Sequence, residues 1–327
     1  MILIFMKNTG TPSHPEKPRL ITEQEAGQRV DNWLVKYFKG IPKSHVYRLI
    51  RTGQVRINGG RIKPTYRLIA GDHIRIPPFV PALRAPARAQ PRLRRAPNYP
   101  ILYEDDDLMV VNKPSGMAVH GGTGITSGMI EQLRLAQPEG AFLELAHRLD
   151  RSTSGCLIFA KNRSSLIAIH ASLRAGGLDK CYLALLMGNP DWNDRKIDGA
   201  LVRNRPSGGE RISQMDEHGK TARSHFKIVR RWPTAALAEI QIETGRTHQI
   251  RVHAAHLGHP IAGDEKYGER EFNRFVKTRY GLKRLFLHAR SLTLPHPRTK
   301  LPLTVQAPLP PDLESTILGL DQGVASS

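Results

Sequence analysis

Cysteine and long apolar segments are both scarce in this chain of 327 residues. The two cysteines, Cys156 and Cys181, cannot form a disulfide framework and lack the Cys-x-x-Cys spacing of a metal site. No apolar run approaches the roughly 18 residues that a membrane-spanning helix needs. The apolar opening, residues 1–6, is too short for a signal-peptide core, and its basic neighbour Lys7 follows it. With 39% apolar and 24% charged residues, we expect a globular, cytoplasmic protein.

Acidic residues are few in the first 100 positions, which hold 5 of them against 19 lysines and arginines, a net +14. The remaining 227 residues hold 24 acidic and 30 basic residues, or +6, within a total of +20. Such asymmetry is typical of a polyanion-binding module attached to a more balanced body. A solubilising basic face is the alternative; a membrane surface is disfavoured because no basic amphipathic helix with an aromatic face is present. We favour nucleic acid as the partner.

Residues 19–77 have the pattern of a compact helix–helix–hairpin unit. A first helix is predicted by apolar residues at helical spacing, namely Val30, Trp33, Leu34, Tyr37 and Phe38. A second, shorter helix directs Val46, Leu49 and Ile50 inward and ends at Gly53. Alternation over residues 54–58 and the following Asn-Gly-Gly predict a hairpin, and residues 73–77 predict a further strand.

Other boundaries follow from composition. Residues 1–18 are polar and without periodicity, so we expect a flexible leader. Residues 77–100 contain seven prolines, five arginines and no acidic residue, which predicts an extended basic linker over 78–100. This linker is as suited to an auxiliary RNA contact as to a solvated tether. The larger domain should span residues 101–310, and residues 311–327 should form a terminal tail.

The larger domain mixes strand runs with few helices. Strands are predicted over residues 108–111, 156–160, 182–186 and 238–242, and helices over residues 164–173 and 248–257. This order indicates an α+β body, not a regular βαβ wind.

Cofactor and metal signatures are missing. No Gly-x-Gly-x-x-Gly fingerprint or phosphate-binding loop is present. Four histidines, His248, His253, His256 and His259, invite a zinc site, but they lack His-Glu-x-x-His spacing and a completing cysteine or carboxylate. We therefore predict neither a cofactor nor a metal.

Two segments concentrate ionisable groups beside glycine, residues 146–155 and residues 243–253. In the first, Asp150 is bracketed by Arg148 and Arg151. A carboxylate held ionised by arginine can act as a nucleophile or base at neutral pH. Spacing alone favours a structural ion pair over catalysis.

The sequence His-Arg-Leu-Asp-Arg-Ser-Thr-Ser-Gly at residues 147–155 resembles the signature of the RluA-type family of pseudouridine synthases. Residues 180–184 resemble the tyrosine motif of that family, residues 245–253 its arginine motif, and residues 112–120 a further strand and loop. Residues 27–77 resemble the S4-like RNA-binding domain. The likeness spans roughly residues 20–310 and departs from the family pattern at Ser152 and Cys156, neither of which has a role there.

The resemblance implies a fold and a reaction. The expected fold is α+β: a small N-terminal S4-like domain of two helices and a hairpin, linked to a mixed, mainly antiparallel-sheet catalytic domain. The expected activity is an RNA pseudouridine synthase, an isomerase that flips a uridine out, breaks its base–ribose bond and rejoins the base through carbon 5. Further shared runs at residues 40–44, 119–122 and 284–289 point to members that act on large-subunit (23S) ribosomal RNA.

The resemblance also implies site residues. Asp150 matches the catalytic aspartate, Tyr182 the tyrosine that packs against the target base, and Arg251 the basic partner of the aspartate. Ile250 matches part of the apolar pocket wall, and Arg148 matches the arginine that fills the space left by the extruded uridine, with His147 beside it. Without the family, Tyr182 reads as ordinary core, Arg251 as a structural partner and Arg148 as a phosphate ligand. Whether Asp150 attacks the ribose or first removes its 2′ proton stays open.

The basic face of the N-terminal unit should supply the RNA contacts, and five residues share it: Lys43, Ser44, Arg48, Arg51 and Arg56. Phosphate contacts orient a protein without reading sequence. We expect ribosomal RNA as the partner of a monomeric enzyme. Two alternatives remain: the same chemistry on transfer RNA or another ribosomal segment, and a non-catalytic RNA-binding assembly factor. Intact Asp150, Tyr182 and Arg251 speak against the latter.

Overall fold

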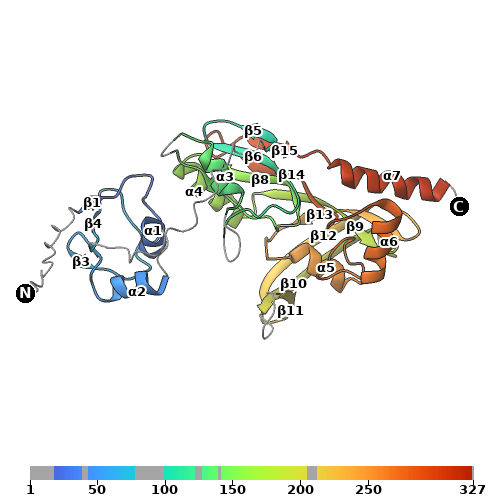
Figure 1. Ribbon diagram of the computed structural model, residues 1–327, viewed down its shortest axis with the longest axis horizontal. Helices are drawn as coiled ribbons and strands as arrows, with labels where there is room; N and C mark the ends of the chain where they lie inside the picture. The colour runs from blue at the N-terminus through green and yellow to red at the C-terminus, as the bar shows by residue number, and fades with distance from the viewer. Residues whose placement is uncertain are drawn as a thin grey trace, which may run out of the picture. The chain divides into compact units, whose positions relative to one another are not determined.

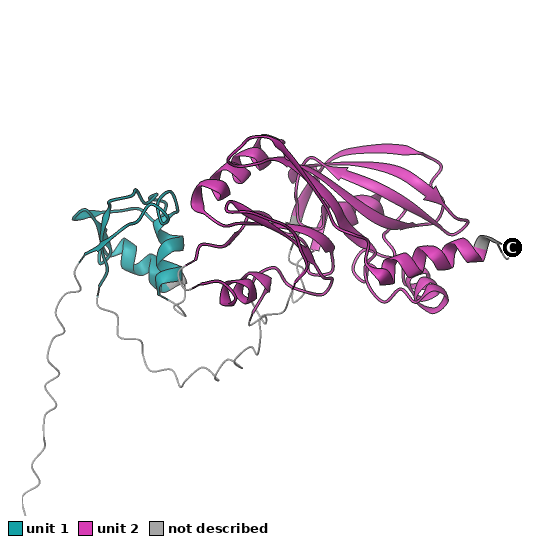
Figure 2. Ribbon diagram, turned by 90° about the horizontal axis from the view of Figure 1, so that it is seen from above, with its two compact units in different colours: residues 1–93 teal, residues 94–327 magenta. Residues whose placement is uncertain are grey.

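The computed structural model describes residues 18–38, 43–77, 99–121, 127–138, 141–204 and 212–325. The chain divides into two compact units, residues 1–93 and residues 94–327 (Figure 2). Apart from residues 18, 99 and 100, the predicted leader and linker lie outside the described residues. No helix in the described part is long and apolar enough to cross a membrane.

Unit 1 contains two helices and a four-stranded sheet of order β1-β4-β2-β3. Its elements are β1 (Arg19–Leu20), α1 (Val30–Tyr37), α2 (Lys43–Arg51), β2 (Arg56–Ile57), β3 (Gly60–Arg61) and β4 (His73–Arg75). All described strand pairs in this sheet are antiparallel. This agrees with the two predicted helices and hairpin.

The helices of unit 1 form because their apolar residues lie on one face. Those predicted to point inward in α2, Val46, Leu49 and Ile50, are at most 5% exposed. Tyr37 of α1 is the exception to the predicted pattern: it is 36% exposed and stacks on Trp33 with ring centroids 5.2 Å apart. The hairpin turn needs two residues with positive φ, and the chain supplies Asn58 (φ 49°) and Gly59 (φ 78°).

Unit 2 is built on one 11-stranded sheet, whose main path runs β11-β10-β12-β13-β9-β14-β8-β6-β5, with β15 on β14 and β7 on β8 (Figure 1). The strands are β5 (Ile101–Glu104), β6 (Leu108–Lys113), β7 (Glu144–Leu145), β8 (Ser154–Ala160), β9 (Asp179–Met187), β10 (Asp194–Asn204), β11 (Ile212–Met215), β12 (Lys220–Arg231), β13 (Ala235–Ile242), β14 (Leu287–Pro295) and β15 (Pro302–Gln306). Only the β14–β8 pair is parallel among the described pairs. The predicted mixed, mainly antiparallel sheet is therefore confirmed.

The sheet buries both of its faces near β6 and β8. Met109 and Val111 pack into one apolar cluster, while Leu108 and Val110 pack into another on the opposite face. This explains why residues 108–111 read as a continuous apolar run without alternation.

In the described part of unit 2, five helices accompany the sheet: α3 (Met129–Leu135), α4 (Arg163–Arg174), α5 (Gln249–His256), α6 (Arg270–Tyr280) and α7 (Pro311–Ala325). Apolar residues of α5 and α6 share a core with those of β9 and β13, and Figure 1 shows both helices beside these strands. The terminal tail predicted over residues 311–327 is corrected: most of it forms α7, whose Leu313 and Leu320 are 0% and 2% exposed and join that core.

Candidate active site

Asp150 lies in the loop between β7 and β8, and the turn after β6 holds this loop. Lys113, which is fully buried, donates hydrogen bonds from Nζ to three backbone carbonyls, those of Pro114 (3.0 Å), Arg151 (3.0 Å) and Thr153 (2.6 Å). Burial lowers the pKa of Lys113 to about 7, and the charge of Asp150 opposes this. One side chain thus fixes the backbone on the C-terminal side of Asp150.

Strand β14 brings the Asp150 loop next to β9. Ala289 pairs with Gly155 of β8 in parallel and with Tyr182 of β9 in antiparallel register. Gly155 has φ 109°, and a Cβ there would lie 2.2 Å from the Ala289 carbonyl oxygen. Glycine is required because the neighbouring backbone occupies that space. Asp150 and Tyr182 are therefore neighbours through a strand that lies more than 100 positions later in the sequence.

Two side chains from the start of α5 face the Asp150 carboxylate. Arg251 Nη1 lies 3.5 Å and His248 Nε2 lies 3.9 Å from Asp150 Oδ2. His248 has φ 56°, and its Nδ1 is 2.8 Å from the hydroxyl of Tyr267. Burial lowers the pKa of His248, although the charge of Asp150 opposes the shift. An arginine at this distance stabilises the negative charge of a carboxylate.

Arg251 is held in place by a second aspartate. Its Nε and Nη2 donate to the two carboxylate oxygens of Asp264 at 2.7 and 2.8 Å, and the Asp264 side chain is completely buried. The Asp264 carboxylate also accepts the backbone N–H groups of Lys266 and Tyr267. Burial alone would raise the pKa of Asp264, but the hydrogen bonds and charge of Arg251 hold it below its usual range. Bidentate pairing of this kind fixes the guanidinium plane.

Tyr182 is 6% exposed and contributes its ring to the floor of the site. No described residue forms a hydrogen bond with its hydroxyl. Burial raises the pKa of Tyr182, and the charge of Asp150 raises it further. The phenol is therefore neutral near pH 7 and can offer a proton or a hydrogen bond to a bound group.

These residues line a small pocket of about 70 Å³. Its apolar wall comes from Leu149, Tyr182, Ile242, Ile250 and Leu287. Its polar lining includes Asp150 and three arginines, Arg148, Arg246 and Arg251. The pocket therefore combines an apolar wall with a carboxylate, and its arginines favour a ligand that carries negative charge.

Arg148 and His147 lie differently from each other. Arg148 is exposed on the rim of the Asp150 pocket. His147 does not line that pocket: it lines an adjoining groove, and its Nε2 accepts a hydrogen bond from the Ile158 backbone N–H at 3.1 Å. Burial, with the charge of Lys180, lowers the pKa of His147 to about 4, so the ring is neutral. The hydrogen bond of His147 therefore attaches the Asp150 loop to β8.

The predicted RNA-contact residues all lie in unit 1. Arg48 and Arg51 are exposed on α2, as expected. Arg56 is half-buried and donates to the carbonyls of Gly53 and Gly59 within the hairpin. The side chains of Lys43 and Ser44 lie outside the described residues.

Three of the four histidines considered for zinc take separate partners. His253 Nδ1 lies 3.0 Å from Ser224 Oγ, His259 Nδ1 lies 2.9 Å from the Met187 carbonyl, and His248 contacts Tyr267. Each therefore belongs to the local packing of its own element.

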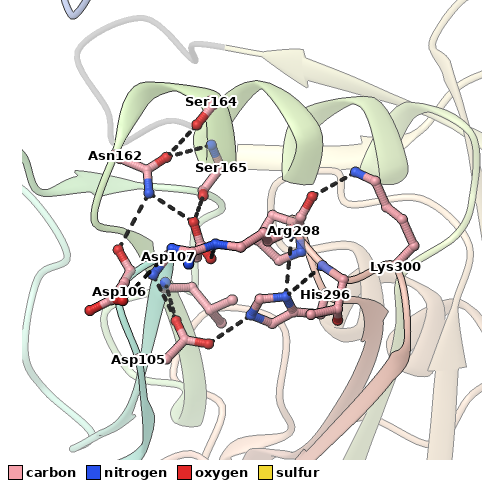
Figure 3. A network of polar contacts seen from close by, with 12 residues as sticks. Asp105, Asp106, Asp107, Asn162, Ser164, Ser165, His296, Arg298 and Lys300 are labelled. Carbon is pink, nitrogen blue, oxygen red and sulfur yellow. Dashed lines mark hydrogen bonds and ion pairs between the residues drawn. The ribbon is translucent and has the colours of Figure 1, made fainter.

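A separate cluster joins Asp105, Asp107 and His296 (Figure 3). The Asp105 carboxylate accepts His296 Nε2 at 2.7 Å and two backbone N–H groups, while Asp107 pairs with Arg298 at 2.6 Å and accepts bonds from Asn162 and Ser165. A cation here would meet carboxylates that already have partners, one of them a guanidinium. The cluster fastens the β5–β6 turn to α4 and to the β14–β15 turn.

Sequence reasoning missed three residues that organise the site: Lys113 as a clamp, Asp264 as the anchor of Arg251, and Tyr267 as the partner of His248. Lys113 gave a signal, because a lysine ending an apolar strand needs buried acceptors. Asp264 and Tyr267 lie in an irregular segment without periodicity, where the sequence carries no comparable signal.

Comparisons with known proteins agree with this architecture. Residues 107–256 match the family model described as RNA pseudouridylate synthase, and residues 28–74 match the S4 domain. The chain is 48% identical over 304 residues to ribosomal large subunit pseudouridine synthase C of Escherichia coli (strain K12), covering 92% of this chain and 95% of that protein. The protein of the same name from Pasteurella multocida (strain Pm70) is 46% identical over 309 residues, covering 94% of each chain.

Two solved structures are similar to this chain over about two thirds of its length or more. Human RNA pseudouridylate synthase domain containing 1 aligns with a TM-score of 0.56 at 28% identity, covering 71% of this chain and 95% of that one. Human RNA pseudouridylate synthase domain containing 4 aligns with a TM-score of 0.54 at 27% identity, covering 68% of this chain and 93% of that one.

Proposed function

This chain belongs to the RNA pseudouridylate synthase family, and on that premise we propose that it converts specific uridines of large-subunit (23S) ribosomal RNA to pseudouridine. Relatives of 46–48% identity along nearly the whole chain carry the large ribosomal subunit in their names. The S4 domain gives the enzyme a second, basic surface for the same RNA. We place the reaction in the cytoplasm and assign it to a monomer.

The reaction is an isomerisation whose atoms balance within the nucleotide. The bond between ribose C1′ and uracil N1 breaks, the base turns, and a bond from C1′ to uracil C5 forms. The proton on C5 is lost and N1 gains one, so no net oxidation or reduction takes place. The enzyme must therefore flip the nucleotide out, keep the loosened base and supply a carboxylate.

Asp150 is the carboxylate in this proposal, acting either on ribose C1′ or on the 2′ proton. Arg251 stabilises its negative charge from 3.5 Å while Asp264 fixes the arginine. Tyr182 and Ile250 hold the two faces of the uracil ring, so that the base turns without leaving. The observation that carries the proposal is this anchored arginine beside a carboxylate over an apolar floor.

Arg148 stands on the rim of the pocket, where an extruded nucleotide leaves the RNA. Its exposed guanidinium fills the space left by the uridine and pairs with RNA acceptors. His147 supports this arginine through its bond to the β8 backbone.

Unit 1 docks the enzyme on RNA in this proposal. Arg48 and Arg51 offer phosphate contacts from the exposed face of α2. The proposal keeps Lys43, Ser44 and Arg56 of the same unit as further RNA contacts. Such contacts orient the enzyme without reading sequence, so binding should weaken steeply as salt is raised.

The test uses transcripts of large-subunit ribosomal RNA carrying uracil tritiated at carbon 5. Formation of the new carbon–carbon bond releases that tritium as water. We expect release from the wild-type protein and none above background from Asp150→Asn. An inactive wild-type protein contradicts the enzymatic proposal, and equal release from both proteins contradicts the role of Asp150.

A further inference from the structure

Two buried lysines of unit 2 differ in what surrounds their charge. Lys113 is 0% exposed, and its three ammonium hydrogens reach three carbonyls. Lys180 is 9% exposed, yet no described residue lies within hydrogen-bonding or ion-pairing distance of its Nζ. Withdrawing a cation from water without an acceptor is unfavourable. The Nζ of Lys180 is not sealed from water, and an acceptor for it must come from outside the described part of the chain.

The neighbours of Lys180 within the sheet do not meet this need. Leu292 of β14 lies directly opposite it and is 2% exposed. Asp179 precedes it in β9 and is exposed, because successive side chains point to opposite faces of a strand. Burial lowers the pKa of Lys180, and the charge of Asp179 only partly opposes this.

Lys180 lies on the same face of β9 as Tyr182, two residues away. At about 3.3 Å per strand residue, the two Cα atoms are roughly 7 Å apart along the strand. Lys180 also lines a groove of about 970 Å³ that continues from the Asp150 pocket, sharing Arg148, Tyr182, Gly245 and Arg246 with it. An RNA strand with one base placed against Tyr182 would thus lie close to Lys180.

The groove is strongly basic. Besides Lys180, its lining includes four arginines, namely Arg148, Arg174, Arg223 and Arg246. Glu243 is the single acidic residue among the described lining residues, and its carboxylate lies 3.6 Å from Arg223. The charge of the groove therefore fits a polyanion and not a neutral or cationic ligand.

We propose that Lys180 is a substrate-binding residue that contacts a phosphodiester group of the RNA strand beside the flipped uridine. The groove is then the path of that strand. This inference rests on the proposed function and adds a phosphate site within unit 2, separate from the S4 domain. A phosphate oxygen supplies the missing acceptor, and a compact ammonium binds phosphate as a point charge.

The experiment compares Lys180→Met, Lys180→Arg and Lys227→Met, each in the Asp150→Asn background, so that RNA binds without turnover. Lys227 is an exposed lysine of β12 that lines neither the groove nor the Asp150 pocket. Affinity for one large-subunit ribosomal RNA transcript is measured at several salt concentrations, and unfolding by urea is measured for each protein. The same Lys180 substitutions in the otherwise wild-type protein are assayed for tritium release.

Lys180→Met should weaken RNA binding by roughly 10- to 100-fold at low salt. The slope of log affinity against log salt should fall in magnitude by about 0.7, the value for one single-strand phosphate contact. Lys180→Arg should keep most of that slope, and Lys227→Met should leave it unchanged. Unfolding of Lys180→Met should need at least as much urea as wild type, because a buried cation without a protein acceptor has been removed.

An unchanged affinity and salt slope for Lys180→Met would overturn the proposal, as would a lower urea midpoint with normal RNA binding. A fall in turnover with an unchanged salt slope would also overturn the proposal, because Lys180 would then contact the flipped base and not a phosphate. Failure of the proposed function has a different signature: wild-type protein then releases no tritium, whatever the binding of the Lys180 variants.

Discussion

The buried pair of Arg251 and Asp264 allows one prediction to be worked through from geometry. Their side chains are 9% and 0% exposed, and two hydrogen bonds of 2.7 and 2.8 Å join them. In Asp264→Asn, an amide N–H₂ replaces one acceptor and meets the donor of Arg251 Nε. The buried guanidinium then keeps one neutral amide acceptor, and its only anionic partner among the described residues is the Asp150 carboxylate at 3.5 Å. Removing one partner of a buried pair destabilises a protein by about 3–5 kcal/mol.

Activity should fall for a separate reason. Arg251 loses the contact that fixes its plane, and a displacement of about 1 Å in a catalytic group can lower turnover roughly 100-fold. We expect Asp264→Asn to lower kcat for tritium release by about that factor and to lower the free energy of unfolding measured in urea. Glu239→Gln is the matched control, because Glu239 forms an exposed ion pair with Arg290 and should contribute about 1 kcal/mol or less.

A double variant separates stability from chemistry. Replacing a buried ion pair with apolar residues of similar volume is often neutral or stabilising. Arg251→Met with Asp264→Leu should therefore regain most of the lost unfolding free energy while remaining inactive. The reasoning is refuted if Asp264→Asn unfolds within about 1 kcal/mol of wild type and keeps its kcat.

Further predictions concern the scaffold of the site. Lys113→Met leaves three carbonyls without their donor and should lower the unfolding free energy by about 2–4 kcal/mol, and kcat with it; a normal urea midpoint would contradict the clamp. Gly155→Ala should destabilise far more than Gly116→Ala, whose added Cβ meets nothing within 4 Å and whose positive φ costs about 1–2 kcal/mol; similar thermal midpoints would show that β14 moves aside. Burial raises the pKa of Asp105, but backbone and side-chain hydrogen bonds outweigh burial and lower this pKa to about 2. The ionised Asp105 therefore stabilises the folded protein above pH 4, and this stabilisation is lost as the pH falls through 2. The free energy of unfolding of wild type, measured in urea, should thus fall by about 2 kcal/mol relative to that of Asp105→Asn over that pH range. If the unfolding free energies of the two proteins change in parallel with pH, the ionised Asp105 does not stabilise the fold.

Patterns among neighbouring residues predicted several helices, turns and strands correctly. The apolar spacing of α1 and α2 and the Asn58-Gly59 turn each follow from a few adjacent residues. The continuous apolar run of β6 was equally informative, because a strand buried on both faces needs no alternation. The motif around Asp150 pointed to a loop that lines the candidate pocket, although spacing alone gave only a carboxylate between two arginines.

Long-range pairing is what the sequence could not supply. The loop of Asp150 comes next to Tyr182 because Ala289 of β14 pairs with Gly155 of β8, which follows that loop, and with Tyr182 of β9. The residues of β14 carry no local pattern that predicts this pairing. Residues 311–327 were expected to form a tail, yet most of them form α7, which packs beside α6 and buries Leu313 and Leu320. Asp264 was missed because an ion pair with Arg251 depends on how an irregular loop folds back on a helix.

The central claim is that the Asp150 carboxylate makes pseudouridine in large-subunit ribosomal RNA, and detection of the product nucleoside tests it most directly. An unmodified transcript is incubated with wild type, with Asp150→Asn or with the control Asp191→Asn, then digested to nucleosides and separated by chromatography with mass detection. Asp191 is an exposed aspartate between β9 and β10 that does not line the Asp150 pocket. Pseudouridine has the mass of uridine but keeps its base attached through carbon, so its fragmentation differs. The account predicts pseudouridine from wild type and Asp191→Asn and none from Asp150→Asn. Product from Asp150→Asn, or none from wild type, would contradict it.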